Sequence, residues 1–131
     1  MSNAREPSLL YANRILTSKS NTPNGEVSPL TTFHYIQAPS TPHIVSATYS
    51  GGSIVQGHLI GTLKENALRM VYHHVNDKGE VMTGRCTSTP EVLEDGRLRL
   101  HESWEWTSGG VGKGESVVEE IEGGQAAEEK R

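Results

Sequence analysis

Apolar and polar residues alternate along much of this chain, and Gly, Asn, Asp and Pro interrupt the alternation at short intervals. Leu98 and Leu100, for example, alternate with Arg97, Arg99 and His101. Successive side chains of a β-strand point to opposite faces of its sheet, so a period of two is typical of strands with one buried face. No stretch of useful length has the apolar spacing of an amphipathic helix. We therefore predict an all-β fold.

Turn residues divide the alternating pattern into eight predicted strands. The predicted ranges are 9–17, 26–37, 43–50, 53–63, 67–76, 80–90, 97–107 and 115–121. Connections such as Gly51-Gly52 and Glu94-Asp95-Gly96 favour tight hairpins, because glycine adopts the positive φ values that such turns require. We therefore expect consecutive strands to pair antiparallel, as a meander.

A meander of eight short strands leaves two unpaired edges unless the sheet closes on itself. Closure into an eight-stranded antiparallel up-and-down barrel of the calycin or lipocalin-like type removes both edges. The alternative is a two-sheet β-sandwich. The chain has 131 residues, enough for one domain, which we place at residues 1–121. Residues 122–131 are acidic and poor in apolar side chains, and we expect them to be disordered.

Composition argues against several classes of function. The net charge is −4 and no cluster of Lys or Arg is present, so we expect no nucleic-acid partner. No long apolar run or leader is visible, which predicts a cytoplasmic protein without membrane contact. Cys86 is the only cysteine, which excludes an intrachain disulfide, and the six histidines include no HExxH. We therefore predict neither a metal site nor a cofactor.

The hairpin turns also predict which side chains face the interior. The predicted pairs across neighbouring strands are Gly57 with His74, Leu59 with Tyr72, Gly84 with both Tyr72 and Trp106, Met70 with Cys86, Cys86 with Trp104, and Ser88 with Glu102. The inward set for the fourth to seventh strands is then Val55, Gly57, Leu59, Gly61, Leu63, Leu68, Met70, Tyr72, His74, Met82, Gly84, Cys86, Ser88, Leu98, Leu100, Glu102, Trp104 and Trp106. Most of these residues are apolar, as the interior of a barrel requires.

Glu102 is the exception in this inward set, because it lies between leucines and tryptophans. A carboxylate removed from water without a partner is strongly destabilising, so Glu102 needs hydrogen bonds, a proton or nearby water. It either closes a polar network in the core with Ser88, His74 or a tyrosine, or lines a ligand cavity. A third possibility is a shifted register that leaves Glu102 in solvent.

The leading hypothesis is a protein that binds a small, partly polar molecule at the mouth of the barrel or inside it. The candidate ligand-binding residues are Tyr72, His74, Cys86, Ser88, Glu102, Trp104 and Trp106. In this hypothesis Glu102 and His74 orient the ligand, Tyr72 exchanges a hydrogen bond with it, and Trp104 packs against it.

Two other classes of function stay open. His74 and Glu102 could act as an acid/base pair in a small hydrolase or isomerase, although no nucleophile motif is present and we assign no catalytic residue. Alternatively, the protein is a structural or homodimeric interaction module. We place Val45, Tyr49, Ile54 and Ile60 on the outer faces of the third and fourth strands, where a contiguous patch would favour a homodimer.

Three segments carry a resemblance to a family of small, largely uncharacterised microbial proteins, some of which are named N-acetylglutamate synthase. The segments are NTPNGEVSPLTTFHY, YSGGSIVQGHLIGTL and MVYHHVNDKGEVMTGRCTSTPEVLEDGRLRLHESWEWTSG, and the resemblance covers about residues 11–121. The acetyltransferase domain of such enzymes is an α/β fold with a pyrophosphate-binding loop, which this sequence lacks, so we do not expect that activity. In architecture, a meander with a Trp near a TSG loop also resembles avidin-like and lipocalin-like ligand binders.

Overall fold

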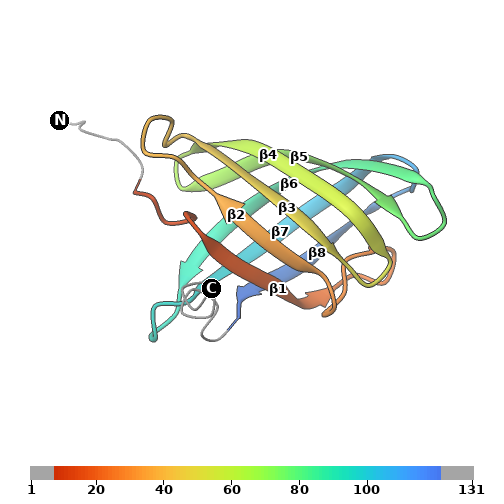
Figure 1. The fold of residues 1–131 in the computed structure, drawn as a ribbon, viewed down its shortest axis with the longest axis horizontal. Coiled ribbons are helices and arrows are strands. Elements are labelled where there is room, and N and C mark those ends of the chain that lie inside the picture. The colour runs from red at the N-terminus through yellow and green to blue at the C-terminus, as the bar shows by residue number, and fades with distance from the viewer. Residues whose placement is uncertain (1–7, 122–131) are drawn as a thin grey trace.

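Eight antiparallel strands form a closed barrel in the computed structural model, which describes residues 8–121 (Figure 1). The strands are β1 (Arg14–Asn21), β2 (Thr32–Ile36), β3 (Ile44–Gly51), β4 (Ile54–Lys64), β5 (Ala67–Asn76), β6 (Val81–Val92), β7 (Leu98–Ser108) and β8 (Lys113–Glu120). Each strand pairs with the next along the chain, and β8 pairs with β1. This confirms the predicted all-β, up-and-down barrel. The acidic tail predicted at 122–131 lies outside the described residues.

The register from β4 to β7 is the one that hairpin geometry predicts. Gly57 pairs with His74, and Ser88 pairs with Glu102. The other predicted pairs are also observed: Leu59 with Tyr72, Tyr72 with Gly84, Met70 with Cys86, Cys86 with Trp104, and Gly84 with Trp106. The β4–β5 turn accounts for part of this agreement, because Glu65 and Asn66 both adopt the positive φ of a tight hairpin.

The predicted faces of β3 and of the start of β4 are wrong. Val45 and Tyr49 are buried in the core, as is Ile54, whereas Val55 is exposed. On β3, the apolar residues alternate with serine and threonine, and burial selects the apolar set. On β4, a bulge between Ile54 and Gln56 reverses the alternation relative to the rest of the strand. Of the four residues predicted on the outer faces, only Ile60 is exposed.

The first two strands begin later than predicted. Residues 10–13 form a turn that ends at Asn13, whose positive φ of 58° interrupts extended backbone before β1. Residues 26–31 were predicted as strand but lead into β2 as a loop, in which the amide of Thr31 donates to the carbonyl of Ser28. Pro29 lies within this turn and has no amide hydrogen to give to a ladder. As a result, residues 22–31 form a long β1–β2 loop at one end of the barrel.

At the end of the barrel opposite the β1–β2 loop, ion pairs connect β8 to β1 on one side and to the start of β7 on the other. Glu119 on β8 accepts from Arg97 and from Arg99, at 2.9 and 3.0 Å. Glu120 pairs with Arg14 of β1. These contacts join the first and last strands to β7. Residues 8–121 contain no helix long and apolar enough to span a membrane.

Candidate functional site

A cavity of about 50 Å³ lies inside the barrel, toward the end that carries the β1–β2 loop. Six of the seven predicted site residues line it: Tyr72, His74, Cys86, Glu102, Trp104 and Trp106. The seventh, Ser88, is buried directly across from Glu102 but does not reach the cavity. The loop contributes Gly25, Glu26 and Val27 to the lining. The structure therefore brings most of the predicted residues around one interior space.

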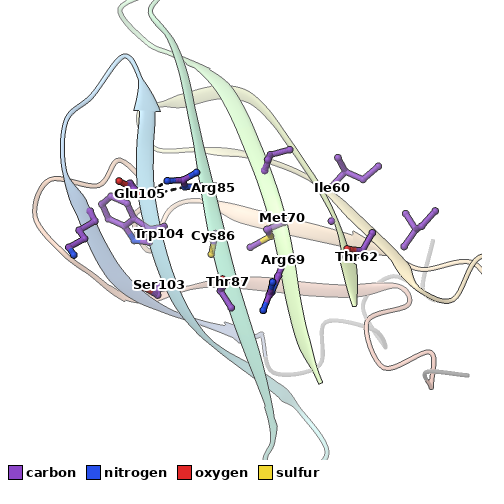
Figure 2. A pocket seen from close by; sticks show the side chains of 14 residues that line it. Ile60, Thr62, Arg69, Met70, Arg85, Cys86, Thr87, Ser103, Trp104 and Glu105 are labelled. Atoms are coloured by element: carbon purple, nitrogen blue, oxygen red, sulfur yellow. Dashed lines mark hydrogen bonds and ion pairs between the residues drawn. The ribbon is translucent and has the colours of Figure 1, made fainter. Parts of the chain in front are cut away.

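A broader hollow of about 740 Å³ lies against the outer face of the sheet (Figure 2). Its rim includes Ile60, Arg69 and Arg85, which are exposed to solvent. Arg85 forms an exposed ion pair of 3.0 Å with Glu105 of the next strand. Its charged side chains Arg69, Arg85 and Glu105 are all exposed. We therefore take the interior cavity as the candidate site.

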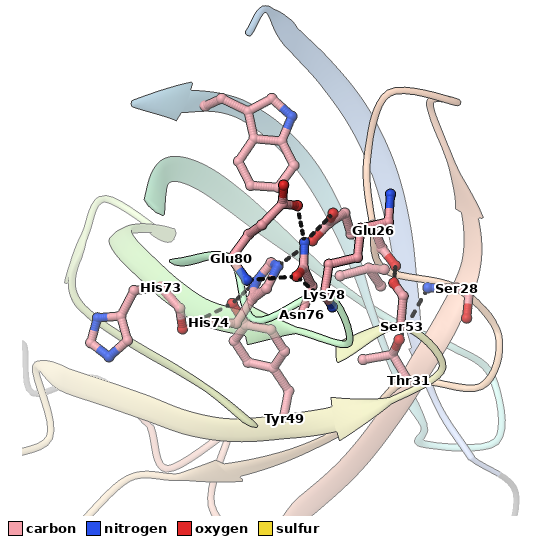
Figure 3. A network of polar contacts seen from close by, with 12 residues as sticks. Glu26, Ser28, Thr31, Tyr49, Ser53, His73, His74, Asn76, Lys78 and Glu80 are labelled. Atoms are coloured by element: carbon pink, nitrogen blue, oxygen red, sulfur yellow. Dashed lines mark hydrogen bonds and ion pairs between the residues drawn. The ribbon is translucent and has the colours of Figure 1, made fainter. Parts of the chain in front are cut away.

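His74 is the centre of a buried hydrogen-bond network at the mouth of this cavity (Figure 3). Its Nδ1 lies 2.9 Å from the hydroxyl of Tyr49, and its Nε2 lies 2.7 Å from Oε1 of Glu26. An ionised carboxylate only accepts hydrogen bonds, so we place a proton on Nε2. Glu26 Oε2 accepts a second hydrogen bond, of 3.0 Å, from Nδ2 of Asn76. His74 therefore pairs with Glu26, and Glu102, one of the partners considered from the sequence, is not its partner.

Glu26 and Asn76 were not among the predicted site residues. Glu26 comes from the loop between β1 and β2, and it meets His74 and Asn76 at the end of β5, about fifty positions away. No alternation or turn pattern relates a loop side chain to a strand so distant in sequence. The only available signal was the position of Glu26 directly after the turn residues Asn24 and Gly25.

The two tryptophans form an aromatic wall along one side of the cavity. Trp106 makes edge contacts with Trp104, Tyr72 and His74, at ring-centroid separations of 5.6 to 6.0 Å. Both indole N–H groups donate outward: Trp106 to the carbonyl of Asn24 and Trp104 to the side chain of Asn21. The wall is therefore tied to the end of β1 and to the β1–β2 loop, and its rings are held in fixed orientations.

Two glycines make room for the tyrosines of the site. A Cβ atom on Gly57 would lie 2.6 Å from the ring of Tyr49 and 2.9 Å from Cβ of His74. A Cβ atom on Gly84 would lie 2.2 Å from the ring of Tyr72. The space predicted beside Tyr72 and His74 is thus present, although Tyr49 rather than a cavity fills much of the space at Gly57.

Glu102 lies farther along the barrel from the β1–β2 loop than His74 does, and the residue is partly buried. Its Oε1 accepts a 3.1 Å hydrogen bond from Ser116 of β8, a partner that the sequence did not indicate. The hydroxyl of Ser88 lies across the strand pair but forms no hydrogen bond of ordinary geometry. Burial raises the pKa of Glu102 to about 7, and the hydroxyls of Ser116 and Ser88 oppose part of that shift. Near neutral pH, Glu102 is therefore present in both protonation states.

His74 and Cys86, the histidine and the thiol that line the cavity, are both buried. The side chain of His74 is only 1% exposed, and both of its ring nitrogens are engaged. Burial, followed by the charge of Glu102, raises the pKa of Cys86 far above its usual range, which makes this thiol a poor nucleophile. Within residues 8–121, no group of three or more His, Cys, Asp or Glu side chains is placed to hold a metal ion.

Comparison with known proteins gives one assignment. The family model described as avidin-like protein matches residues 9–121, which span all eight strands. No curated protein and no solved structure matches the chain. The match agrees with the closed eight-stranded barrel and with the resemblance to avidin-like barrels drawn from the sequence. The chain belongs to the avidin-like protein family.

Proposed function

We propose that this protein binds a small, partly polar molecule in the cavity at the loop-bearing end of its barrel. The observation that carries the proposal is that an aromatic wall and the polar side chains of Glu26 and His74 line one interior space, with Asn76 hydrogen-bonded to Glu26 behind them. Ligand cavities are typically built in this way, with apolar walls and a small number of placed hydrogen-bonding groups. Eight-stranded barrels, streptavidin among them, can hold one small ligand in their interior.

The cavity is too small in its present form for most metabolites. Its volume of about 50 Å³ has room for one or two water molecules, whereas ordinary ligand pockets span roughly 300–1,000 Å³. The segment Gly25–Val27 covers the mouth and belongs to a half-exposed loop that is not part of the sheet. We propose that residues 24–27 move outward when the ligand enters, and that the ligand takes the place of this segment.

Ligand screening by two independent signals tests the proposal. Tryptophan fluorescence and saturation-transfer NMR would be recorded on the full chain with a panel of polar aromatic and heterocyclic compounds that includes biotin. A ligand of the cavity is expected to alter the emission of Trp106 and to bind about tenfold or more weakly to His74→Gln. His73→Gln is the matched control, because His73 is the adjacent residue on β5 but faces solvent. If no compound produces either signal, the proposal is wrong.

A homodimer formed through the outer face is a separate proposal about assembly. Ile60 and Val71 are paired across β4 and β5, and 53% and 58% of their surfaces are exposed. These two side chains form an apolar spot on the outer face. Arg85 lies beside this spot, because it pairs with Val71 on the neighbouring strand β6. Light scattering across a range of concentrations tests the proposal, with Ile60→Thr expected to shift a dimer toward monomer. A monomer at every concentration would overturn it.

A further inference from the structure

We propose that the donors of His74 and Asn76 form a carboxylate-binding recess, which Glu26 occupies as an internal substitute for the ligand. The ligand class is then a small organic acid whose carboxylate is joined to a flat, apolar body. This inference rests on the proposed function and adds the chemistry that the site selects.

The two donors are oriented by contacts that do not involve Glu26. The side-chain oxygen of Asn76 accepts the backbone amides of Lys78 and Glu80, at 3.0 and 2.9 Å, and its Nδ2 also donates to Oε1 of Glu80, at 2.8 Å, which leaves the second N–H of Nδ2 directed at Glu26. The hydroxyl of Tyr49 holds Nδ1 of His74 and so directs Nε2 to the same side. Both donor side chains are buried. The recess therefore belongs to the rigid end of β5 and its turn, and it persists when the loop leaves.

The occupying carboxylate, by contrast, comes from a loop that lies outside the sheet. The side chain of Glu26 is 24% exposed, and its backbone is outside every strand ladder. Beyond this carboxylate, residues 24–27 are tied to the barrel by four hydrogen bonds. Asn21 donates to the carbonyl of Val27, Trp106 to that of Asn24 and Ser53 to that of Glu26, and the side chain of Asn24 donates to the carbonyl of Lys113. Leu30, farther along the same loop, is 74% exposed. Each of these contacts is a single hydrogen bond, whereas the carboxylate of Glu26 makes two, both to buried side chains.

An incoming carboxylate would make the same two hydrogen bonds that Glu26 makes, while Glu26 regains its contacts with water. The exchange is therefore close to neutral in hydrogen bonds, and affinity comes from the rest of the ligand. The aromatic wall is close enough to receive that rest, because the ring of His74 lies 6.0 Å from that of Trp106. A flat apolar group attached to the acid would pack there after the segment Gly25–Val27 withdraws.

Glu26 also lowers the apparent affinity for such a ligand. A side chain tethered by a short loop competes at an effective concentration on the order of millimolar. The apparent dissociation constant equals the intrinsic one divided by the fraction of molecules whose recess is empty. Removing the carboxylate from the loop is therefore expected to tighten the binding of organic acids, and not the binding of their neutral analogues.

Indole-3-acetate and its neutral amide, indole-3-acetamide, are matched probes for this difference. Calorimetric titration of the full chain is expected to show that Glu26→Ala binds the acid about tenfold or more tightly than the unaltered protein does. The affinity for the amide should increase much less. Adding Asn76→Ala to Glu26→Ala should remove the preference for the acid. Glu105→Gln, a change to an exposed carboxylate on the outer face, is the control and should leave both affinities unchanged.

The side-chain amide signals of Asn76 give a second measurement on the unaltered protein, which does not depend on how the variants fold. Indole-3-acetate should shift these signals, whereas the amide should not. Equal binding of acid and amide by Glu26→Ala would overturn the carboxylate recess but leave the binding cavity intact. Absence of binding by either probe to every variant, together with a negative ligand screen, would overturn both proposals.

Discussion

Gly84 lies directly across the β5–β6 ladder from Tyr72, and a methyl group on Gly84 would come within 2.2 Å of both Cζ and the hydroxyl of that ring. It would also lie 2.7 Å from the carbonyl oxygen of Glu105. The absence of a side chain at Gly84 therefore sets the position of Tyr72 against Trp106. One wall of the cavity depends on this close approach.

Gly84→Ala is accordingly expected to destabilise the barrel by about 1–3 kcal/mol, because an overpacked interior forces side chains off their preferred rotamers. Urea unfolding followed by tryptophan fluorescence measures the change. Tyr72→Leu in the Gly84→Ala background should recover part of the loss, because the shorter side chain vacates the contested space. If the changes in unfolding free energy caused by the two substitutions simply add in the double variant, the proposed clash is contradicted.

Glu102 makes stability depend on pH in a direction opposite to that of most carboxylates. The pKa of Glu102 is about 7 in the folded chain, against 4.5 for an unperturbed glutamate. Between these values the folded state binds more protons than the unfolded state, so its stability falls as the pH rises through this window. The full difference is about 3 kcal/mol.

Glu102→Gln should therefore reduce the loss of stability between about pH 4.5 and 7 and stabilise the protein at pH 8 relative to the unaltered chain. Denaturant unfolding at a series of pH values measures both effects. Glu105→Gln, on the same strand but facing outward, is the control and should leave the pH profile unchanged. If the stability of Glu102→Gln falls with pH as steeply as that of the unaltered protein, Glu102 is not the group responsible.

Glu119→Gln should lower the urea midpoint measurably, since this nearly buried carboxylate accepts from both Arg97 and Arg99 beside the seam of the barrel. Unfolding should also depend less on salt in the variant. Glu91→Gln is the comparison, because Glu91 contacts Arg99 and His101 in solvent. Exposed pairs of this kind contribute little, so equal effects of the two substitutions would contradict a special role for Glu119.

Cys86 should resist modification in the folded protein. Its thiol is buried and its pKa is raised well above the usual range, so little thiolate is present at neutral pH. Labelling by iodoacetamide is expected to proceed only as fast as the barrel opens, and to become rapid in urea. Rapid labelling under native conditions would show that the interior is open at this point.

The parts of this fold that the sequence predicts are those that depend on neighbouring strands. A hairpin turn and the alternation of its two strands are local properties, so the Ser88–Glu102 pair and the inward position of Trp104 follow from counting along the chain. The start of β2 was harder to predict, because the composition of residues 26–31 is compatible with either a strand or a loop. Contacts around Pro29 select the loop.

The site was predictable only where it is built from strands. His74 and Trp106 were placed on one interior face from their strand positions, but the identity of the acid that meets His74 was not. Glu26 reaches His74 through the path of a loop, and this path depends on packing that no periodicity encodes. The inward position of Ile54 was missed for a related reason, since a bulge changes the alternation without leaving a clear mark in the sequence.

The ladder between β1 and β8 has a consequence for how the chain can be rearranged. Leu16 pairs with Glu120, so the entry into the first strand and the exit from the last lie together at one end of the barrel. Every strand has a neighbour on each side, and none is structurally first. A circular permutant that joins the ends near β1 and β8 and opens the chain at Gly96 would keep all eight ladders. The order of the strands around the barrel, rather than the point where the chain begins, defines this fold.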